Sequence, residues 1–157
     1  MSGIFLDIGG GEVPKEGFIN VDAYYPKAEV KAFADKLPYD DEIVDEIYSS
    51  HMLEHCGKYE IPKILSEWFR VLKHGGKLIL PVPDLEWCCR YWLEHQSTEW
   101  EMDIIFGHQN SPGEFHKTGF NKDIGFNYLI NAGFKVEKIE ELSTHSQKTL
   151  SFECKKG

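Results

Sequence analysis

Three successive apolar segments near the start of the chain end in residues suited to holding a small polar ligand. Gly9 to Gly11 follow the first segment, Asp22 ends the second and Asp35 ends the third. Glycine lets a backbone turn tightly and approach a ligand closely, and a carboxylate at a strand end accepts hydrogen bonds from ribose hydroxyls. Asp35 could accept from the exocyclic amine of a purine. Capping of a turn or helix explains either aspartate alone, so the prediction depends on all three features together.

A second group of residues has the spacing of a metal site. His51-Met52-Leu53-Glu54-His55 matches H-x-x-E-H, the inverted zinc-protease signature. On a helix, His51 and His55 would share one face and hold zinc, with Glu54 as the base. The motif directly follows a strand-like run and precedes Cys56-Gly57, a context that disfavours a helix. A zinc hydrolase is therefore the remote alternative.

The elements that must position these residues follow from hydrophobic spacing. Short apolar runs bounded by turn residues predict strands, and apolar residues three and four apart predict helices. The last two strands are joined by a polar turn and form a hairpin. The predicted strands are 3–8, 18–22, 30–35, 43–49, 77–82, 135–142 and 148–154, and the predicted helices are 59–72, 84–96 and 121–132.

Alternating strands and helices predict an α/β fold in a single domain over residues 1–157. We expect a Rossmann-like, doubly wound and mostly parallel sheet with a C-terminal antiparallel hairpin strand. Only residues 12–17 separate the glycines from the second strand, too few for the usual crossover helix. The prediction is therefore a sheet that lacks the helix between its first two strands.

Charge and cysteine content limit the partners and the compartment. The net charge is −9, whereas nucleic-acid-binding domains carry a basic face, so a neutral or cationic small substrate or a partner protein fits better. None of the four cysteines forms a C-x-x-C pair, which favours reduced thiols in a cytoplasmic protein. No apolar run approaches the ~18 residues of a membrane span, and we expect no signal peptide.

Several motifs together resemble the class I S-adenosylmethionine-dependent methyltransferases, and most of all their small type 11 group. They are LDIGGG, INVD, LPYDDEIVDEIYSSHMLEH, RVLKHGGKL and the closing NAGF. The resemblance implies S-adenosylmethionine as cofactor and S-adenosylhomocysteine as product. It also implies the cofactor contacts: Asp7, Gly9 and Gly11 on the methionine side, Asp22 at the ribose, Asp35 with the backbone of Lys36 and Leu37 at the adenine, and Ser49, Ser50 and His51 beside the ammonium and sulfonium.

Within this resemblance, the expected activity is methyl transfer to a small-molecule or carbohydrate-type acceptor. The sulfonium is already activated, so placement of the acceptor dominates and a base is needed only if the acceptor must lose a proton. His51 and His116 are the candidate catalytic residues, with His55 and Asp84 also near the pocket mouth. Residues 107–119 form the longest irregular segment, and their aromatic, histidine and lysine content suits a substrate lid.

The chain departs from the family by lacking the first crossover helix and the helices that often precede the first strand. We therefore expect an open cofactor site and a sheet face covered by a second copy or a partner subunit. The alternative function is a non-catalytic S-adenosylmethionine-binding module that depends on such a partner.

Overall fold

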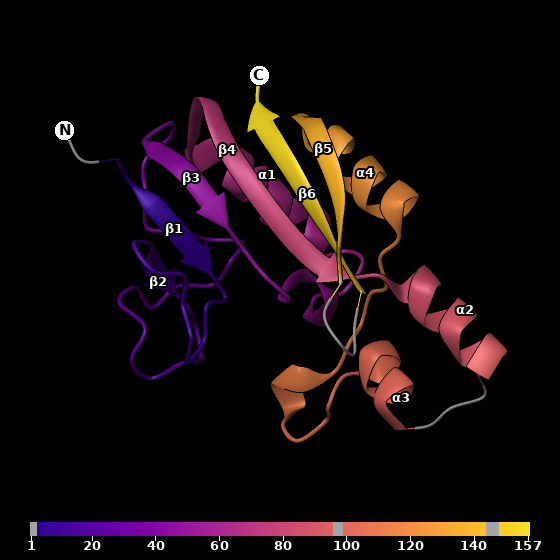
Figure 1. The fold of residues 1–157 in the computed structure, drawn as a ribbon. Helices are drawn as coiled ribbons and strands as arrows, with labels where there is room; N and C mark the ends of the chain where they lie inside the picture. Colours follow the sequence, from indigo (N-terminus) through magenta and orange to yellow (C-terminus); the bar gives the residue numbers. More distant parts are fainter. Residues whose placement is uncertain (1–2, 96–98, 144–147) are drawn as a thin grey trace.

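A six-stranded sheet organises the computed structural model, which describes residues 3–95, 99–143 and 148–157 (Figure 1). The strand order is β2-β1-β3-β4-β6-β5, with β1 to β4 parallel and β6 antiparallel to both of its neighbours. This confirms the mostly parallel Rossmann-like sheet with its C-terminal antiparallel hairpin. The strands are β1 (Phe5–Ile8), β2 (Ile19–Val21), β3 (Val44–Tyr48), β4 (Leu72–Pro83), β5 (Phe134–Ser143) and β6 (Lys148–Lys156).

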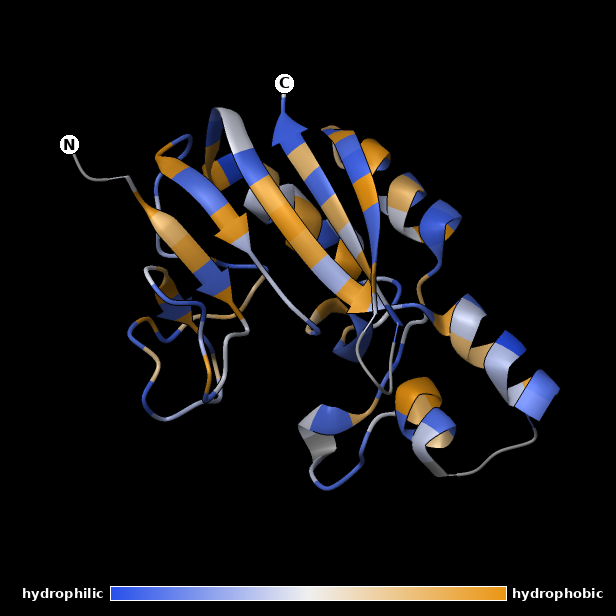
Figure 2. Ribbon diagram, in the orientation of Figure 1, coloured by the Kyte–Doolittle hydropathy of each residue, from blue (hydrophilic) through white to orange (hydrophobic). Residues whose placement is uncertain are grey.

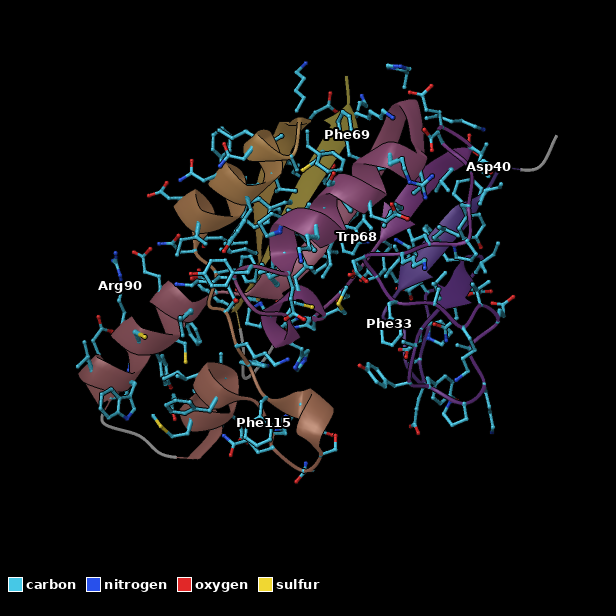
Figure 3. The ribbon with its side chains drawn as sticks, turned by 180° about the vertical axis from the view of Figure 1, so that it is seen from behind. Phe33, Asp40, Trp68, Phe69, Arg90 and Phe115 are labelled. Carbon is cyan, nitrogen blue, oxygen red and sulfur yellow. The ribbon has the colours of Figure 1, made fainter. Side chains whose placement is uncertain are left out.

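The helices fall into two groups. α1 and α4 lie behind the sheet in Figure 1 and in front of it in Figure 3, so they cover one face. α2 and α3 contact each other beyond the end of β4. The helices are α1 (Ile61–Val71), α2 (Leu85–His95), α3 (Glu99–Phe106) and α4 (Lys122–Asn131), with 3₁₀ turns η1 (Leu53–His55) and η2 (Pro112–Glu114).

The core lies between the sheet and the helices α1 and α4. Trp68 of α1 is fully buried there, and its indole N–H donates to the carbonyl of Ala34 at 3.0 Å. α4 approaches β6 so closely that a Cβ on Gly125 would lie 2.3 Å from Cζ of Phe152. Figure 2 shows a run of apolar residues in β4 and an alternation of apolar and polar residues along β6. Such an alternation is expected where only one face of a strand meets the core.

No described helix covers the other face of the sheet. Residues 9–18 and 22–43, which would carry helices on that face in a doubly wound sheet, form turns and extended backbone instead. Phe18 and Tyr48 are half-buried on this side, and the Nζ of Lys15 lies 4.8 and 4.1 Å from their ring centroids. Residues 9–18 therefore form no helix between the first two strands, as predicted, and the described helices cover only one face of the sheet.

Two predicted strands differ in extent, and one helix was not predicted. The expected strand 30–35 is reduced to one bridge between Val30 and Val21, because the backbone turns away where the Lys36 amide donates to Phe33. β4 begins at Leu72, directly after α1, so Gly75-Gly76 lies inside the strand. The hydrophobic spacing did not predict α3. The predicted end of α2 at Gln96 and the hairpin turn at 144–147 lie outside the described residues.

Within the described ranges, no helix is both long and apolar enough to cross a bilayer.

Candidate functional site

The glycine segment after β1 has backbone conformations that a side chain would strain. Gly9 has φ 77° and Gly11 has φ 54°. A Cβ on Gly9 would lie 2.4 Å from Cγ of Met52, whereas none of the described atoms lies within 4 Å of the Cβ position on Gly11. Gly9 thus permits close packing, and Gly11 leaves open space at the carboxyl end of β1.

Two acceptor oxygens surround the middle glycine. A Cβ on Gly10 would lie 2.8 Å from Oδ1 of Asn20 and 2.9 Å from Oδ2 of Asp7. Asp7 is buried, which raises the pKa of its carboxyl, although its Oδ2 accepts the Lys15 amide at 2.7 Å. Oδ1 of Asn20 is buried without a hydrogen-bond partner in the described part of the chain. This cradle of acceptors suits a cationic donor such as an ammonium.

The carboxylate of Asp22 is used by its own loop. Its Oδ1 accepts the amides of Tyr24 and Tyr25 at 2.7 and 2.8 Å, and its Oδ2 accepts the amide of Gly11 at 3.2 Å. A carboxylate has about four acceptor positions, so Asp22 can organise this loop and still accept from a ribose hydroxyl.

The predicted adenine contacts differ in whether they are free to bind a ligand. Asp35 is exposed and free to meet a ligand, but the Lys36 amide donates to the carbonyl of Phe33 at 3.0 Å. The amide of Leu37 donates to Oε1 of Glu67 at 2.8 Å. These two N–H groups are therefore satisfied by the protein. Phe33, which the sequence reasoning did not select, lies two residues before Asp35, is 58 % exposed and packs edge-on against the ring of Tyr24 at 5.9 Å between centroids (Figure 3).

The segment from Ser49 to Met52 connects the glycine loop with the neighbouring part of the sheet's carboxyl edge. Ser49 is buried, and its hydroxyl donates to the carbonyl of Ile8 at 2.7 Å. Ser50 is half-buried, and His51 then takes a left-handed φ of 52°. The next residue, Met52, packs against Gly9 as described above. Ser49 to Met52 thus continue from the end of β3, and they bond to the ends of β1 and β4 on either side of it.

A cavity of about 460 Å³ opens at the far end of that segment. It holds both predicted catalytic histidines, His51 and His116, and His55 with them. Asp84 does not line it, because its carboxylate caps α2 by accepting the Trp87 amide at 3.0 Å. The lining residues are His51, Glu54, His55, Pro83, Trp100, Asp103, Ile104, His108, Glu114 and His116.

The histidines of the H-x-x-E-H motif point to different partners. The helix that would align them is only the three-residue turn η1, which begins after His51. Nε2 of His51 lies 3.2 Å from the Thr149 hydroxyl, and its Nδ1 lies 3.4 Å from Oε1 of Glu54. The ring of His55 instead packs edge-on against His116, at 4.9 Å between centroids.

The segment 107–119 closes one side of the cavity and is held to η1 by its backbone. The carbonyl of Glu54 accepts the amides of Lys117 and Thr118 at 2.7 and 3.2 Å. Nδ1 of His116 lies 2.7 Å from the carbonyl of Ile104 in α3, and burial lowers the pKa of this imidazole. His116 is thus favoured in the neutral form that can accept a proton or bind a metal.

Sequence reasoning missed four contributors to this site: Asn20, Phe33, Glu54 as a cavity residue, and α3. Asn20 was visible as part of INVD, but its unpartnered oxygen depends on the packing of Gly10 against it. α3 lacks a clear apolar stripe, so its Ile104 carbonyl could not be assigned to the site in advance.

Comparison with known proteins supports the resemblance. Residues 10–80 match the model of the type 11 methyltransferase domain family, described as "Methyltransferase domain". No curated protein sequence matches the chain.

Solved structures share the fold at low sequence identity. An S-adenosylmethionine-dependent methyltransferase from Methanosarcina mazei has a TM-score of 0.69 and 18 % identity over 99 % of this chain and 94 % of that one. A complex of a Haloferax volcanii methyltransferase with its Trm112 activator has 0.64 and 16 % over 98 % and 82 %. A geranyl diphosphate C-methyltransferase from Streptomyces coelicolor, with Mg²⁺, geranyl diphosphate and S-adenosylhomocysteine, has 0.62 and 12 % over 99 % and 73 %.

Proposed function

We propose that this chain is a class I S-adenosylmethionine-dependent methyltransferase that holds its cofactor at the ends of β1 and β2 and its acceptor in the cavity beside η1. The observation that carries the proposal is the segment Ser49 to Met52, which touches both places. Ser49 is bonded to the end of β1 and Met52 packs on Gly9, while His51 between them lines the cavity. A sulfonium held at the glycine loop would therefore lie beside the acceptor.

The residues at the cofactor edge fit the charges of S-adenosylmethionine. Asp7 and Asn20 present acceptor oxygens around Gly10, where the methionine ammonium would bind. Asp22 retains acceptor capacity for the ribose, and Asp35 with Phe33 would meet the adenine. The cofactor carries no phosphate, so the missing helix N-terminus after the glycines is no obstacle. When bound, the cofactor supplies an activated methyl group, and the protein supplies placement.

The acceptor class is the finer part of the proposal. A cavity of about 460 Å³ is the size of a small-molecule site, and it contains both polar and aromatic side chains. A small molecule or a sugar with hydroxyl groups fits this lining, and His116 in its neutral form would accept a proton from it. His51 is the second candidate, since it lines the cavity and belongs to the segment that reaches the glycine loop. The four free thiols favour the cytoplasm as its place of action.

A second candidate function is a cofactor-binding subunit that needs a partner for activity. The uncovered sheet face around Phe18 and Tyr48 favours it, and the Haloferax volcanii neighbour is a methyltransferase bound to an activator. A second copy of the chain or a partner subunit across this face stays a prediction. Light scattering of the purified chain distinguishes these two occupants of the sheet face. A dimer favours a second copy of the chain, and a monomer favours a partner subunit.

Calorimetric titration with S-adenosylmethionine and S-adenosylhomocysteine tests the cofactor site. We expect saturable binding that Asp22→Ala weakens by ~1–3 kcal/mol, because the ligand hydroxyl would lose a charged acceptor. Asp40→Ala, which removes an exposed carboxylate elsewhere, is the matched control (Figure 3). Absence of binding at millimolar cofactor would contradict the proposal. Binding without turnover on any acceptor would favour the subunit function.

A further inference from the structure

Three potential metal ligands from distant parts of the sequence meet in the cavity. They are Glu54 and His55 of η1 and His116 of the segment 107–119, and one ligand atom of each lies within 4.8 Å of the others. A tetrahedral Zn²⁺ with ligand bonds of about 2.0–2.1 Å places neighbouring ligand atoms roughly 3.3 Å apart. Small side-chain rotations would therefore close the cluster around an ion.

Both imidazoles are oriented with the same nitrogen free. Nδ1 of His55 lies 3.3 Å from the carbonyl of Phe115, and Nδ1 of His116 lies 2.7 Å from that of Ile104. A carbonyl can only accept, so each neutral ring carries its proton on Nδ1 and leaves the Nε2 lone pair available. Proteins commonly orient metal-binding histidines by this hydrogen bond to a backbone carbonyl.

The burial of the Glu54 carboxylate is compensated at only one of its two oxygens. Its side chain is 3 % exposed, and Oε2 has no hydrogen-bond partner among residues 3–95, 99–143 and 148–157. The other oxygen, Oε1, lies 3.4 Å from Nδ1 of His51. A buried carboxylate oxygen without a partner is costly, and a bound cation would supply the missing interaction at Oε2.

The backbone fixes the two halves of the cluster relative to each other. The carbonyl of Glu54 accepts the Lys117 and Thr118 amides, and the Thr118 hydroxyl donates to the carbonyl of Cys56 at 2.8 Å. The His116 amide donates to the carbonyl of Phe106 at 2.9 Å. The ligands are therefore held close together before any ion binds, unlike a chance grouping on a mobile surface.

We propose that Glu54, His55 and His116 bind a divalent transition-metal ion of the zinc class. Two imidazoles and one carboxylate are a ligand set suited to Zn²⁺ or Co²⁺, whereas Mg²⁺ prefers oxygen ligands alone. Three protein ligands leave a coordination position facing the cavity, for water or an oxygen of the acceptor. This site replaces the His51 and His55 pair that the H-x-x-E-H spacing suggested. With Nε2 of His116 on the ion, the base for an acceptor that must lose a proton would be His51.

Titration of chelator-treated protein with Co²⁺, followed by the visible absorption of the bound ion, tests the site without any methyl donor. We expect one Co²⁺ per chain, displaced by Zn²⁺. Glu54→Gln and His116→Ala should each weaken binding by at least about tenfold, because each removes a ligand. His74→Ala, an exposed histidine bonded to the carbonyl of Gly157, is the matched control and should bind as the wild type does.

Zn²⁺ should also raise the midpoint of thermal unfolding of the wild type and not of Glu54→Gln, since an ion that binds only the folded chain stabilises it. This comparison keeps the test valid if His116→Ala does not fold. Wild-type protein without saturable Co²⁺ binding would overturn the proposal, and so would binding that Glu54→Gln and His116→Ala both retain at wild-type strength. Failure here leaves cofactor binding untouched, because the two are measured separately.

Discussion

The two halves of the functional edge are built in different ways. The proposed cofactor half, from Gly9 to Leu37, is a run of neighbouring loops whose polar groups mostly bond within about a dozen residues, as Asp22 does with Gly11 and Tyr24, although the Leu37 amide donates to Glu67 of α1. The acceptor half joins η1 to a segment more than fifty residues later, through Glu54 with Lys117 and Thr118. Local motifs therefore describe the first half, and only tertiary structure describes the second.

Each half nevertheless contains one buried acceptor atom that has no hydrogen-bond partner in the described part of the chain. It is Oδ1 of Asn20 in the cofactor half and Oε2 of Glu54 in the acceptor half. Buried polar atoms without partners are rare in folded proteins and call for a specific explanation. We assign the first to the ammonium of the cofactor and the second to a metal ion. The two halves would then be completed by two different cations.

The largest expected effect tests whether the cofactor half depends on the core. Trp68 is fully buried in α1, and its indole holds the Ala34 carbonyl just before Asp35 (Figure 3). Trp68→Ala should lower the free energy of unfolding by ~3–5 kcal/mol, because it leaves a large cavity. Urea denaturation measures this loss. Trp92→Ala, on the exposed side of α2, should change stability by less than ~0.5 kcal/mol.

A change in the acceptor half should leave the cofactor half intact. Gly107 has φ 83°, and a Cβ there would lie 1.8 Å from the carbonyl oxygen of Glu114. Gly107→Ala should cost ~1–3 kcal/mol and displace the segment that carries His116. Thermal unfolding and cofactor titration check both parts of this expectation. Gly113→Ala is the control, since no described atom lies within 4 Å of its Cβ position. Equal loss of cofactor affinity would show that the halves are not independent.

More of the cofactor half than of the acceptor half could be predicted from the sequence. The glycine turn and Asp22 follow from strand ends alone, because chain direction and residue type determine what lies at the carboxyl edge. The partners of Leu37 and Asn20 could not be predicted, since they depend on how α1 and Gly10 pack. His116 was selected by residue type, but its closeness to His55 depends on a contact across sixty residues of sequence.

Substitution of Asp7 in the cofactor half should affect protein stability and cofactor affinity in different ways. Burial raises the pKa of its carboxyl in the folded state above the ordinary value of 3.8. Protonation therefore favours folding, and wild-type stability gains this contribution as the pH falls through the raised pKa and loses it as the pH rises. Asp7→Asn should be no less stable at pH 7 and should lack that acid gain, because the amide oxygen can still accept from Lys15.

Cofactor affinity of the same variant should fall by about tenfold, since an ammonium loses a charged acceptor. Thermal unfolding at several pH values and calorimetry at neutral pH measure the two effects. A variant that is both less stable and equally tight in binding would assign Asp7 to folding rather than to the ligand.

The smallest expected effect lies at the junction of the two halves. Ser49 was predicted to border the sulfonium, yet its buried hydroxyl donates to the carbonyl of Ile8 at 2.7 Å and so fastens the end of β3 to the end of β1. Ser49→Ala should lower the free energy of unfolding by ~1 kcal/mol, because that carbonyl loses its buried partner. Cofactor affinity should stay unchanged, and Ser66→Ala on the exposed side of α1 should change neither quantity. If affinity falls while stability does not, the hydroxyl turns to the ligand when it binds, and the junction belongs to the cofactor half.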